Sequence, residues 1–403
     1  MTSFDDAKGH ELSVCDGSKA IPEDQDEEHS RRTGSSFGAY FNVICVIAAV
    51  IAVYSGHLLV KCLYYNRVSR LKSYPCIGEA AFGRVGRVVV QIFHFSILLG
   101  TSCIYIMLTG LNTQTLLKQY GVDMNLKILI TIAAVIAWIP FILLKTLKEV
   151  AILSVFGVIA TAIVIIVSAV VGLLDLPNNL HQTHHFVVPA GLPVALASIS
   201  FSFGGNVIYA HVEGTMRHPK SWTRILGLAV LTILLMYIVI GIPGYYVYGE
   251  NTKSPILDNL PEGAATTVAI IMITLHVLLA APIMMTTFAN EMEHSFKIDT
   301  KYLSKTKEFA LRLALRTVIT VVLAVVAMTI PFFGDFMSLI GALANCMTVF
   351  VLPIVFYIKL YGFRTIRIWE LLWCFLVVVI GLIGCVLGAT DAIQSLKRHF
   401  EEA

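Results

Sequence analysis

Apolar residues fill long stretches of the 403-residue chain, and short polar segments separate them. A helix needs about 20 residues to cross about 30 Å of hydrocarbon. Ten stretches reach that length: residues 40–62, 86–110, 126–144, 150–174, 189–211, 223–247, 264–289, 311–330, 336–360 and 368–390. None shows the strict alternation of a transmembrane barrel, and a helix satisfies its own backbone in lipid. The pattern therefore predicts an all-α polytopic membrane protein with about ten spanning helices.

The segment that precedes these stretches is polar and acidic. Residues 1–38 contain the run EDQDEE at 23–28 and no apolar core of signal-peptide length. Such a segment buries too little apolar surface to offset the entropy of ordering it, so we expect a disordered acidic N-terminal tail. It is either a solvated tail or a sorting or regulatory tail. We place the transmembrane domain over 39–392 and a short C-terminal tail over 393–403.

Basic residues orient the predicted helices. Lys and Arg gather in four connections: 61–87, 211–224, 290–312 and 359–367. The loops between them carry few basic residues or none. The positive-inside rule assigns the basic connections to the cytosol and the end of the chain to the opposite side.

Composition excludes several classes of protein. The chain is 57% hydrophobic and 14% charged, with a net charge of +3, whereas soluble domains carry about 25% charged residues. The small net charge argues against nucleic acid as a partner. The eight cysteines show no metal-ligand spacing, and no nucleophile–base set, metal motif or phosphate loop occurs. We therefore expect no enzyme activity, no cofactor and no metal site. Membrane lipids surround the predicted helices, and the absence of glycosylation sequons favours an intracellular membrane.

The stretch SISFSFGGNVIYAHVEGTM, residues 198–216, places poor helix formers inside a predicted span. Each interior glycine costs about 1 kcal/mol relative to alanine, and serine and asparagine side chains compete for backbone hydrogen bonds. We therefore expect the chain to unwind around Gly204 and Gly205. Irregular backbone at membrane depth is tolerated where it lines a cavity or is buried in protein. The alternative is that the paired glycines only let two helices pack closely.

A broken helix suits a small zwitterion, because it presents carbonyls on one half and N–H groups on the other. Carbonyls between Ser200 and Phe203 can hold an ammonium, and N–H groups near Asn206 can face a carboxylate. The break therefore predicts a site for small amino acids. Its candidate substrate-binding residues are Ser200, Ser202, Phe203, Gly204, Gly205 and Asn206.

Four segments resemble helices of the amino acid/auxin permease family, in its vacuolar and vesicular branches. They are YSGHLLVKCLYYN (54–66), KEVAILSVFGVIATAIVIIVSAVVG (148–172), FSFGGNVIYAHVEGTMRHPKSW (201–222) and SLIGALANCMTVFVLPIVFYIKL (338–360). The resemblance implies eleven helices in a leucine-transporter-type fold of two inverted repeats. It also implies secondary active transport of neutral amino acids, coupled to protons or to sodium, at a vacuolar or vesicular membrane.

The resemblance also implies further site residues. Thr101 and Tyr105 match a helix that often walls the substrate pocket, and Thr286 and Thr287 match a helix that can contribute hydroxyls to a coupling-ion site. Threonine in a spanning helix is also common in helix–helix contacts.

Two intramembrane histidines are candidates for proton handling. Intramembrane ionisable side chains often mark proton pathways, so His94 and His276 qualify, and packing is the alternative role for each. Glu213 stands four residues before Arg217, which suggests an i,i+4 ion pair. The HQTHH sequence at 181–185 is either a solvated loop or a metal-binding or acid-sensing one.

The chain departs from the family pattern near its first span. In the family, a glycine-rich break interrupts the first helix and belongs to the substrate site. Here AYFNVICVIA (39–48) continues directly into AVIAVYSGHLLVKCLYYN (49–66). This fused segment either crosses the membrane once or lies folded in it. We expect that amino-acid transport is impaired in this chain, and the alternative function is a non-transporting amino-acid sensor or regulatory membrane protein.

Overall fold

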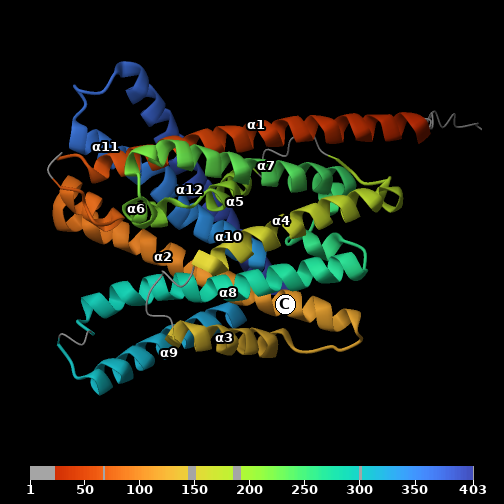
Figure 1. Cartoon of the computed structure of the whole chain (residues 1–403). Helices are drawn as coiled ribbons and strands as arrows, with labels where there is room; N and C mark the ends of the chain where they lie inside the picture. Colours follow the sequence, from red (N-terminus) through yellow and green to blue (C-terminus); the bar gives the residue numbers. More distant parts are fainter. Residues whose placement is uncertain (1–22, 67–68, 144–150, 185–191, 299–301, 403) are drawn as a thin grey trace, which may run out of the picture.

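The computed structural model describes residues 23–66, 69–143, 151–184, 192–298 and 302–402. In these ranges all regular secondary structure is helical, which confirms the predicted class. The axes of most of the long helices lie roughly parallel or antiparallel to one another, as the axes of helices that cross a single membrane do (Figure 1).

Nine helical stretches of the described residues are long and apolar enough to cross a membrane. Eight each follow one long helix: α1 (Glu23–Leu63), α2 (Tyr74–Gln119), α3 (Leu126–Leu143), α4 (Ala151–Leu174), α7 (Trp222–Tyr248), α8 (Ala264–Ser295), α9 (Lys305–Thr329) and α12 (Ile368–Glu402). Of these, α2 is kinked at Phe82 and Gly83, and α7 has a 3-10 turn at each end. The ninth is composite: α10 (Phe333–Ile340), a π-helix over Gly341–Val351, and α11 (Leu352–Tyr361). The tenth expected span consists of two shorter helices, α5 (Leu192–Ser202) and α6 (Asn206–Thr215). A multi-pass membrane protein is confirmed.

Helix α1 runs without interruption through residues 46–51, where the family pattern places a glycine-rich break. The stretch Val43–Leu63 of this helix is apolar and of spanning length, which favours a single crossing over a folded segment. The helix lies beside α7 and also packs on α11 (Figure 1). It begins at Glu23, inside the predicted acidic tail. Residues 1–22 lie outside the described residues, so a disordered tail stays a prediction.

The helix ends form two faces. On one face α1, α6, α8 and α11 end, and α2, α7, α9 and α12 begin, at the left of the bundle in Figure 1. The four basic connections join these ends, so we call this side the basic face. Helix α12 continues past residue 392 to Glu402 at the opposite face, where His399 contacts Asp335 at 2.7 Å. This arrangement agrees with the alternation expected from the basic residues, and the cytosolic assignment of the basic face stays a prediction.

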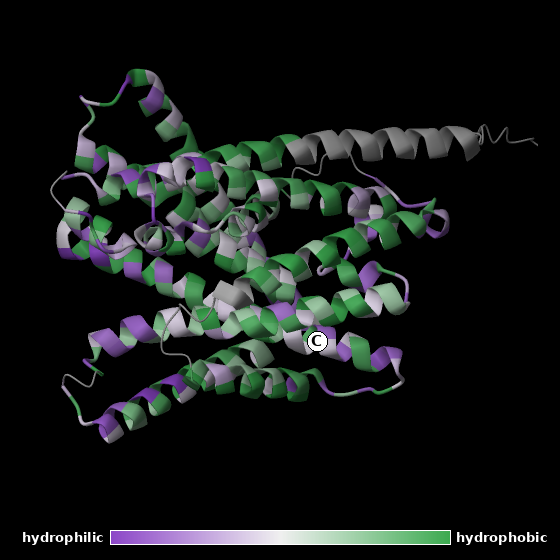
Figure 2. Ribbon diagram, in the orientation of Figure 1, coloured by the Kyte–Doolittle hydropathy of each residue, from purple (hydrophilic) through white to green (hydrophobic). Residues whose placement is uncertain are grey.

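The exterior of the bundle is apolar. Figure 2 shows apolar residues along the middle of the helices and hydrophilic residues gathered towards their ends. Val158, Leu228 and Phe375 are among many large apolar side chains that stay exposed. Water would disfavour apolar exposure of this extent, so lipid is the fitting surrounding.

Candidate functional site

The predicted break is present. Helix α5 ends at Ser202 and α6 begins at Asn206, and Phe203 to Gly205 between them are not helical. Gly204 lies directly against the amide of Asn345, which belongs to the π-helix, so a methyl group there would overlap that amide. The glycine therefore allows a close approach between two segments that both depart from α-helical geometry.

Side chains from neighbouring helices satisfy the backbone that the break releases. The Asn345 Nδ2 donates a hydrogen bond to the Ser200 carbonyl at 3.0 Å. The Tyr237 hydroxyl donates to the Ser202 carbonyl at 2.7 Å. Because a carbonyl oxygen has two lone pairs, each of these two carbonyls keeps capacity for a second donor. The break is thus a stable part of the fold.

Asn206 anchors the second half of the broken helix. It is fully buried, and its Nδ2 donates to the Ser55 Oγ of α1 at 3.0 Å and to the Thr348 carbonyl at 3.2 Å. The Tyr74 hydroxyl donates to the same carbonyl at 2.9 Å, and the Ser55 Oγ donates to the carbonyl of Val349. A π-helix hydrogen-bonds from i to i+5 and often marks a functional site. Here two irregular segments meet inside the bundle.

Some buried polar atoms at this junction lack a partner. The Ser200 Oγ, the Asn206 Oδ1 and the Asn345 Oδ1 make no hydrogen bond to the described residues. Buried polar groups in proteins are usually hydrogen-bonded, so each such atom is a place where a donor would be stabilised.

A cavity of about 490 Å³ lies beside the broken helix, and we call it the chamber. Residues of helices α2, α4, α6, α7 and α8 line it. Its polar lining comes from Tyr105, Thr161, His211, His276 and Thr287, and the rest of the lining is apolar. Among the described residues, no Asp, Glu, Lys or Arg lines it. A volume of this size and a mainly apolar lining are typical of small-molecule sites.

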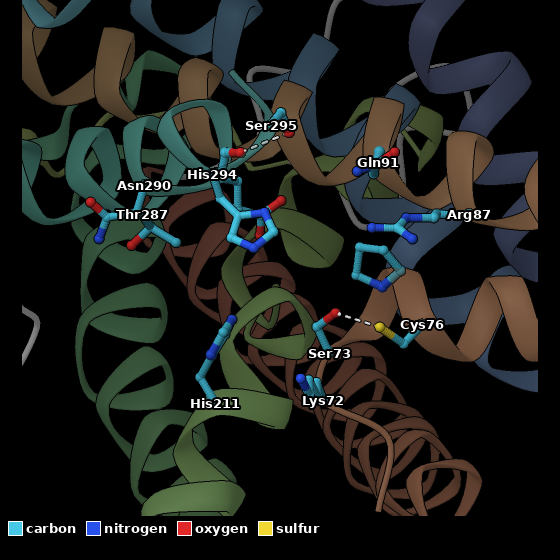
Figure 3. A pocket seen from close by; sticks show the side chains of 12 residues that line it. Lys72, Ser73, Cys76, Arg87, Gln91, His211, Thr287, Asn290, His294 and Ser295 are labelled. Atoms are coloured by element: carbon cyan, nitrogen blue, oxygen red, sulfur yellow. Dashed lines mark hydrogen bonds between the residues drawn. The ribbon is translucent and has the colours of Figure 1, made fainter. Parts of the chain in front are cut away.

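A second cavity of about 470 Å³ opens on the basic face, and we call it the vestibule. It lies among α2, α6, α8 and the connection before α2, and His211 and His294 point into it (Figure 3). Its lining consists of Lys72, Ser73, Pro75, Cys76, Arg87, Gln91, His211, Thr287, Asn290, Glu291, His294 and Ser295. His211 and Thr287 also line the chamber. The two cavities therefore adjoin, and together they extend from the basic face to membrane depth.

The structure brings together only some of the predicted site residues. Tyr105 and Thr287 line the chamber, and the Thr287 Oγ1 donates to the Ile283 carbonyl at 2.9 Å. Thr101 is buried on α2, and Thr286 is buried with its hydroxyl unpaired among the described residues. Neither lines the chamber or the vestibule.

The six residues predicted at the break also line neither cavity. Ser202 is exposed, and its Oγ donates to the Ser198 carbonyl at 3.0 Å. Ile208, two residues after Asn206, does line the chamber. The N-terminal end of α6 therefore reaches the chamber, although the break itself is covered.

The expected pairing of Glu213 with Arg217 is wrong. Glu213 is fully buried and lies 2.7 Å from the Arg70 Nε, and the Tyr64 hydroxyl donates to it at 2.6 Å. An i,i+4 pair adds only a few tenths of a kcal/mol, whereas a buried carboxylate requires a close partner. Burial, followed by the hydrogen bond to this carboxylate, raises the pKa of Tyr64. These contacts connect the end of α6 to the connection between α1 and α2.

Sequence reasoning missed a second charged cluster, between α8 and α9. Arg316 is fully buried, and its Nε lies 2.8 Å from the Glu293 Oε1. It also donates to the carbonyl of Phe141 on α3. Arg312 lies 3.3 Å from the same Glu293 carboxylate and pairs with Glu308. The i,i+4 spacing of 308, 312 and 316 was the available signal, but spacing alone does not reveal burial.

The described part of the HQTHH loop gives no support for a metal site. His184 Nε2 contacts the carbonyls of Tyr245 and Tyr246 at 3.2 and 3.1 Å. No group of three or more possible metal ligands occurs among the described residues. His185 lies outside them.

A multi-pass helical bundle with a broken span and adjoining cavities that reach membrane depth is typical of membrane transporters. Residues 35–394 match the family of transmembrane amino acid transporter proteins, and the chain belongs to that family. The resemblance seen in the sequence is confirmed, and the protein is a transporter-family member rather than an enzyme.

Three plant proteins illustrate the similarity. The chain is 28% identical to amino acid transporter AVT1I of Arabidopsis thaliana over 364 residues, and this alignment covers 88% of each protein. It is 27% identical to AVT1C of the same plant over 365 residues, and this alignment covers 88% of the chain and 64% of the relative. It is also 27% identical over 335 residues to amino acid transporter ANT1, covering 80% of this chain and 77% of the relative. These identities establish common ancestry, and they do not determine the substrate of this chain.

Proposed function

We propose that this protein is a secondary active transporter of neutral amino acids, driven by protons, in a vacuolar or vesicular membrane. The observation that carries the proposal is the route formed by the vestibule and the chamber, which share His211 and Thr287 beside a broken helix. In the orientation expected from the basic residues, this route opens towards the cytosol. A leucine-transporter-type arrangement of inverted repeats, as the resemblance implies, is part of this proposal.

The lining of the chamber favours a substrate with an uncharged side chain. Its described residues include no Asp, Glu, Lys or Arg, so a charged side chain of the substrate would be buried there without a partner, at a high cost. The zwitterionic end can face α6, whose N-terminal turn includes Ile208 in the chamber lining. A helix N-terminus stabilises a carboxylate.

The continuous α1 supports the expectation of impaired transport. In the family a second broken helix supplies part of the substrate site, and here α1 is helical throughout. The solute therefore meets one broken helix instead of two. Inserting a glycine-rich break between residues 46 and 51, with enough apolar residues for a second crossing, should raise the uptake rate. Equal uptake by the two chains would contradict impairment.

A non-transporting amino-acid sensor is the second candidate, and a specific observation favours it. The break is held by hydrogen bonds donated from α7 and the π-helix and by one that Asn206 donates to α1, and transport requires those contacts to rearrange. A sensor would bind amino acids with the same chamber and show no exchange.

Counterflow in proteoliposomes tests the proposal. Vesicles that contain the purified chain are loaded with one unlabelled amino acid, and entry of the labelled form is followed with and without a pH gradient. The proposal predicts exchange of neutral amino acids that acidic and basic amino acids do not inhibit. Saturable binding without exchange would support the sensor, and absence of both would contradict the two candidates.

A further inference from the structure

His94 is a deeply buried ionisable group beside the vestibule. It lies on α2 with 1% of its surface exposed, and neither ring nitrogen makes a hydrogen bond to the described residues. A buried imidazole that makes no hydrogen bond is costly, because it has given up its hydration. Its Nε2 lies 3.4 Å from the Glu291 Oε1 of α8. This distance suits an ion pair that would tighten if the ring gained a proton.

Glu291 connects this buried histidine to solvent. Its side chain is about a quarter exposed and lines the vestibule, so protons from the basic face can reach it. Thr287 lies one helical turn before Glu291 on α8 and lines both cavities. A solute at Thr287 and a proton at Glu291 would therefore act on the same turn of one helix.

We propose that His94 and Glu291 together form the proton-binding site that couples solute movement to a pH gradient. This inference rests on the proposed function. With a neutral imidazole and an ionised carboxylate, the pair carries one negative charge. One proton from the vestibule makes the pair neutral overall, either as imidazolium with carboxylate or as imidazole with carboxylic acid.

Charge explains how the proton would control closure of the vestibule. An ionised Glu291 is hydrated while the vestibule admits water, and sealing the vestibule would remove that hydration while the pair carries a negative charge. Proton binding neutralises the pair, so dehydration costs less for the protonated pair. The other ionisable groups that line the vestibule are Lys72, Cys76, Arg87, His211 and His294, and of these Arg87 pairs with Glu79. Glu293 is held separately by Arg312 and Arg316.

The remaining helices packed on α2 bring few charged side chains towards the pair. Lys127 lies in the first turn of α3, at the face opposite the vestibule. Asp335 of α10 pairs with His399 at that same opposite face. The π-helix contains no Asp, Glu, Lys, Arg or His. Lys359 of α11 lies over the ring of Phe82. His211 of α6 is a further titratable group that interacts electrostatically with both His94 and Glu291.

Two transport assays, uptake driven by a pH gradient and exchange at equal pH, distinguish a proton-binding role of His94 and Glu291 from a purely structural one. In proteoliposomes, His94→Gln and Glu291→Gln should lose the stimulation of uptake by a pH gradient and keep exchange at equal pH. The control His57→Gln alters a histidine of α1 that contacts Thr223 at 2.8 Å, away from both cavities. The control Glu262→Gln alters an exposed carboxylate of the opposite face. Both controls should retain the stimulation. Gradient stimulation that survives in either test variant would overturn the proposal.

Histidine NMR in lipid nanodiscs tests the pair without transport. With ¹⁵N-labelled histidine, the signal missing in His94→Gln identifies His94. The proposal predicts that this signal titrates and that Glu291→Gln shifts its midpoint to lower pH, because the imidazolium loses its counter-charge. The milder Glu291→Asp, for use if the glutamine variant does not fold, should shift the midpoint less. If the midpoint is unchanged in whichever of the two Glu291 variants folds, the proposal that His94 and Glu291 act as a pair is contradicted, whether or not the chain transports. A coupled titration in a chain without any uptake would instead contradict the proposed function alone.

Discussion

The contact between Gly204 and Asn345 allows a quantitative test of how the break is held. The Asn345 amide lies against Gly204 and donates to the Ser200 carbonyl at 3.0 Å. Asn345→Ala leaves that buried carbonyl without this donor, which costs about 1–3 kcal/mol of unfolding free energy. Gly204→Ala should cost a similar amount, because its methyl group displaces the amide. The backbone at Gly204 is outside the positive-φ region, so alanine itself fits the local conformation.

The double variant separates this contact from general damage. Once Asn345 is alanine, the methyl group at position 204 enters vacated space and displaces nothing. The two costs should therefore overlap, with a coupling energy of about 1–2 kcal/mol, whereas independent sites add within about 0.3–0.5 kcal/mol. Reversible unfolding in mixed micelles measures the four free energies. Gly227→Ala is the control, since nothing lies near a methyl group there. Additive losses at 204 and 345 would refute this account of the break.

Two further substitutions test the charged cluster and the chamber. Glu293→Gln leaves the fully buried Arg316 without its closest carboxylate, so unfolding free energy should fall by about 3–5 kcal/mol; a loss below about 1 kcal/mol would show that Arg312 and Glu308 hold α9 without it. Ala280→Trp fills part of the chamber that Ala280 lines and should abolish exchange, while Leu228→Trp on the exposed side of α7 should leave it intact. Equal exchange in the two tryptophan variants would exclude the chamber as the solute site.

The broken span could be predicted because its signal is local. Gly204 and Gly205 in an apolar stretch, with Ser200 and Asn206 beside them, favour a break whatever surrounds them. The apolar lengths and the alternation of basic connections likewise reflect the membrane, which acts on each helix separately. These features can therefore be recognised in the sequence without knowledge of any tertiary contact.

The partners of the buried charges could not be predicted, because they come from distant parts of the chain. Glu213 is 143 residues away from Arg70, and local spacing pointed to Arg217 instead. The location of the chamber was missed for the same reason. Its lining combines five helices, so a residue such as His211 becomes part of it only when they pack.

The central claim is that an amino acid enters from the basic face and binds in the chamber. Thr287 lines both cavities, so Thr287→Cys places a thiol on the route. Cys76 also lines the vestibule, and Cys76→Ser is therefore the background. A membrane-impermeant thiol reagent should modify residue 287 from the basic face only, and a transported neutral amino acid should slow the reaction. Modification that occurs from the opposite face, or at a rate that no amino acid changes, would contradict the claim.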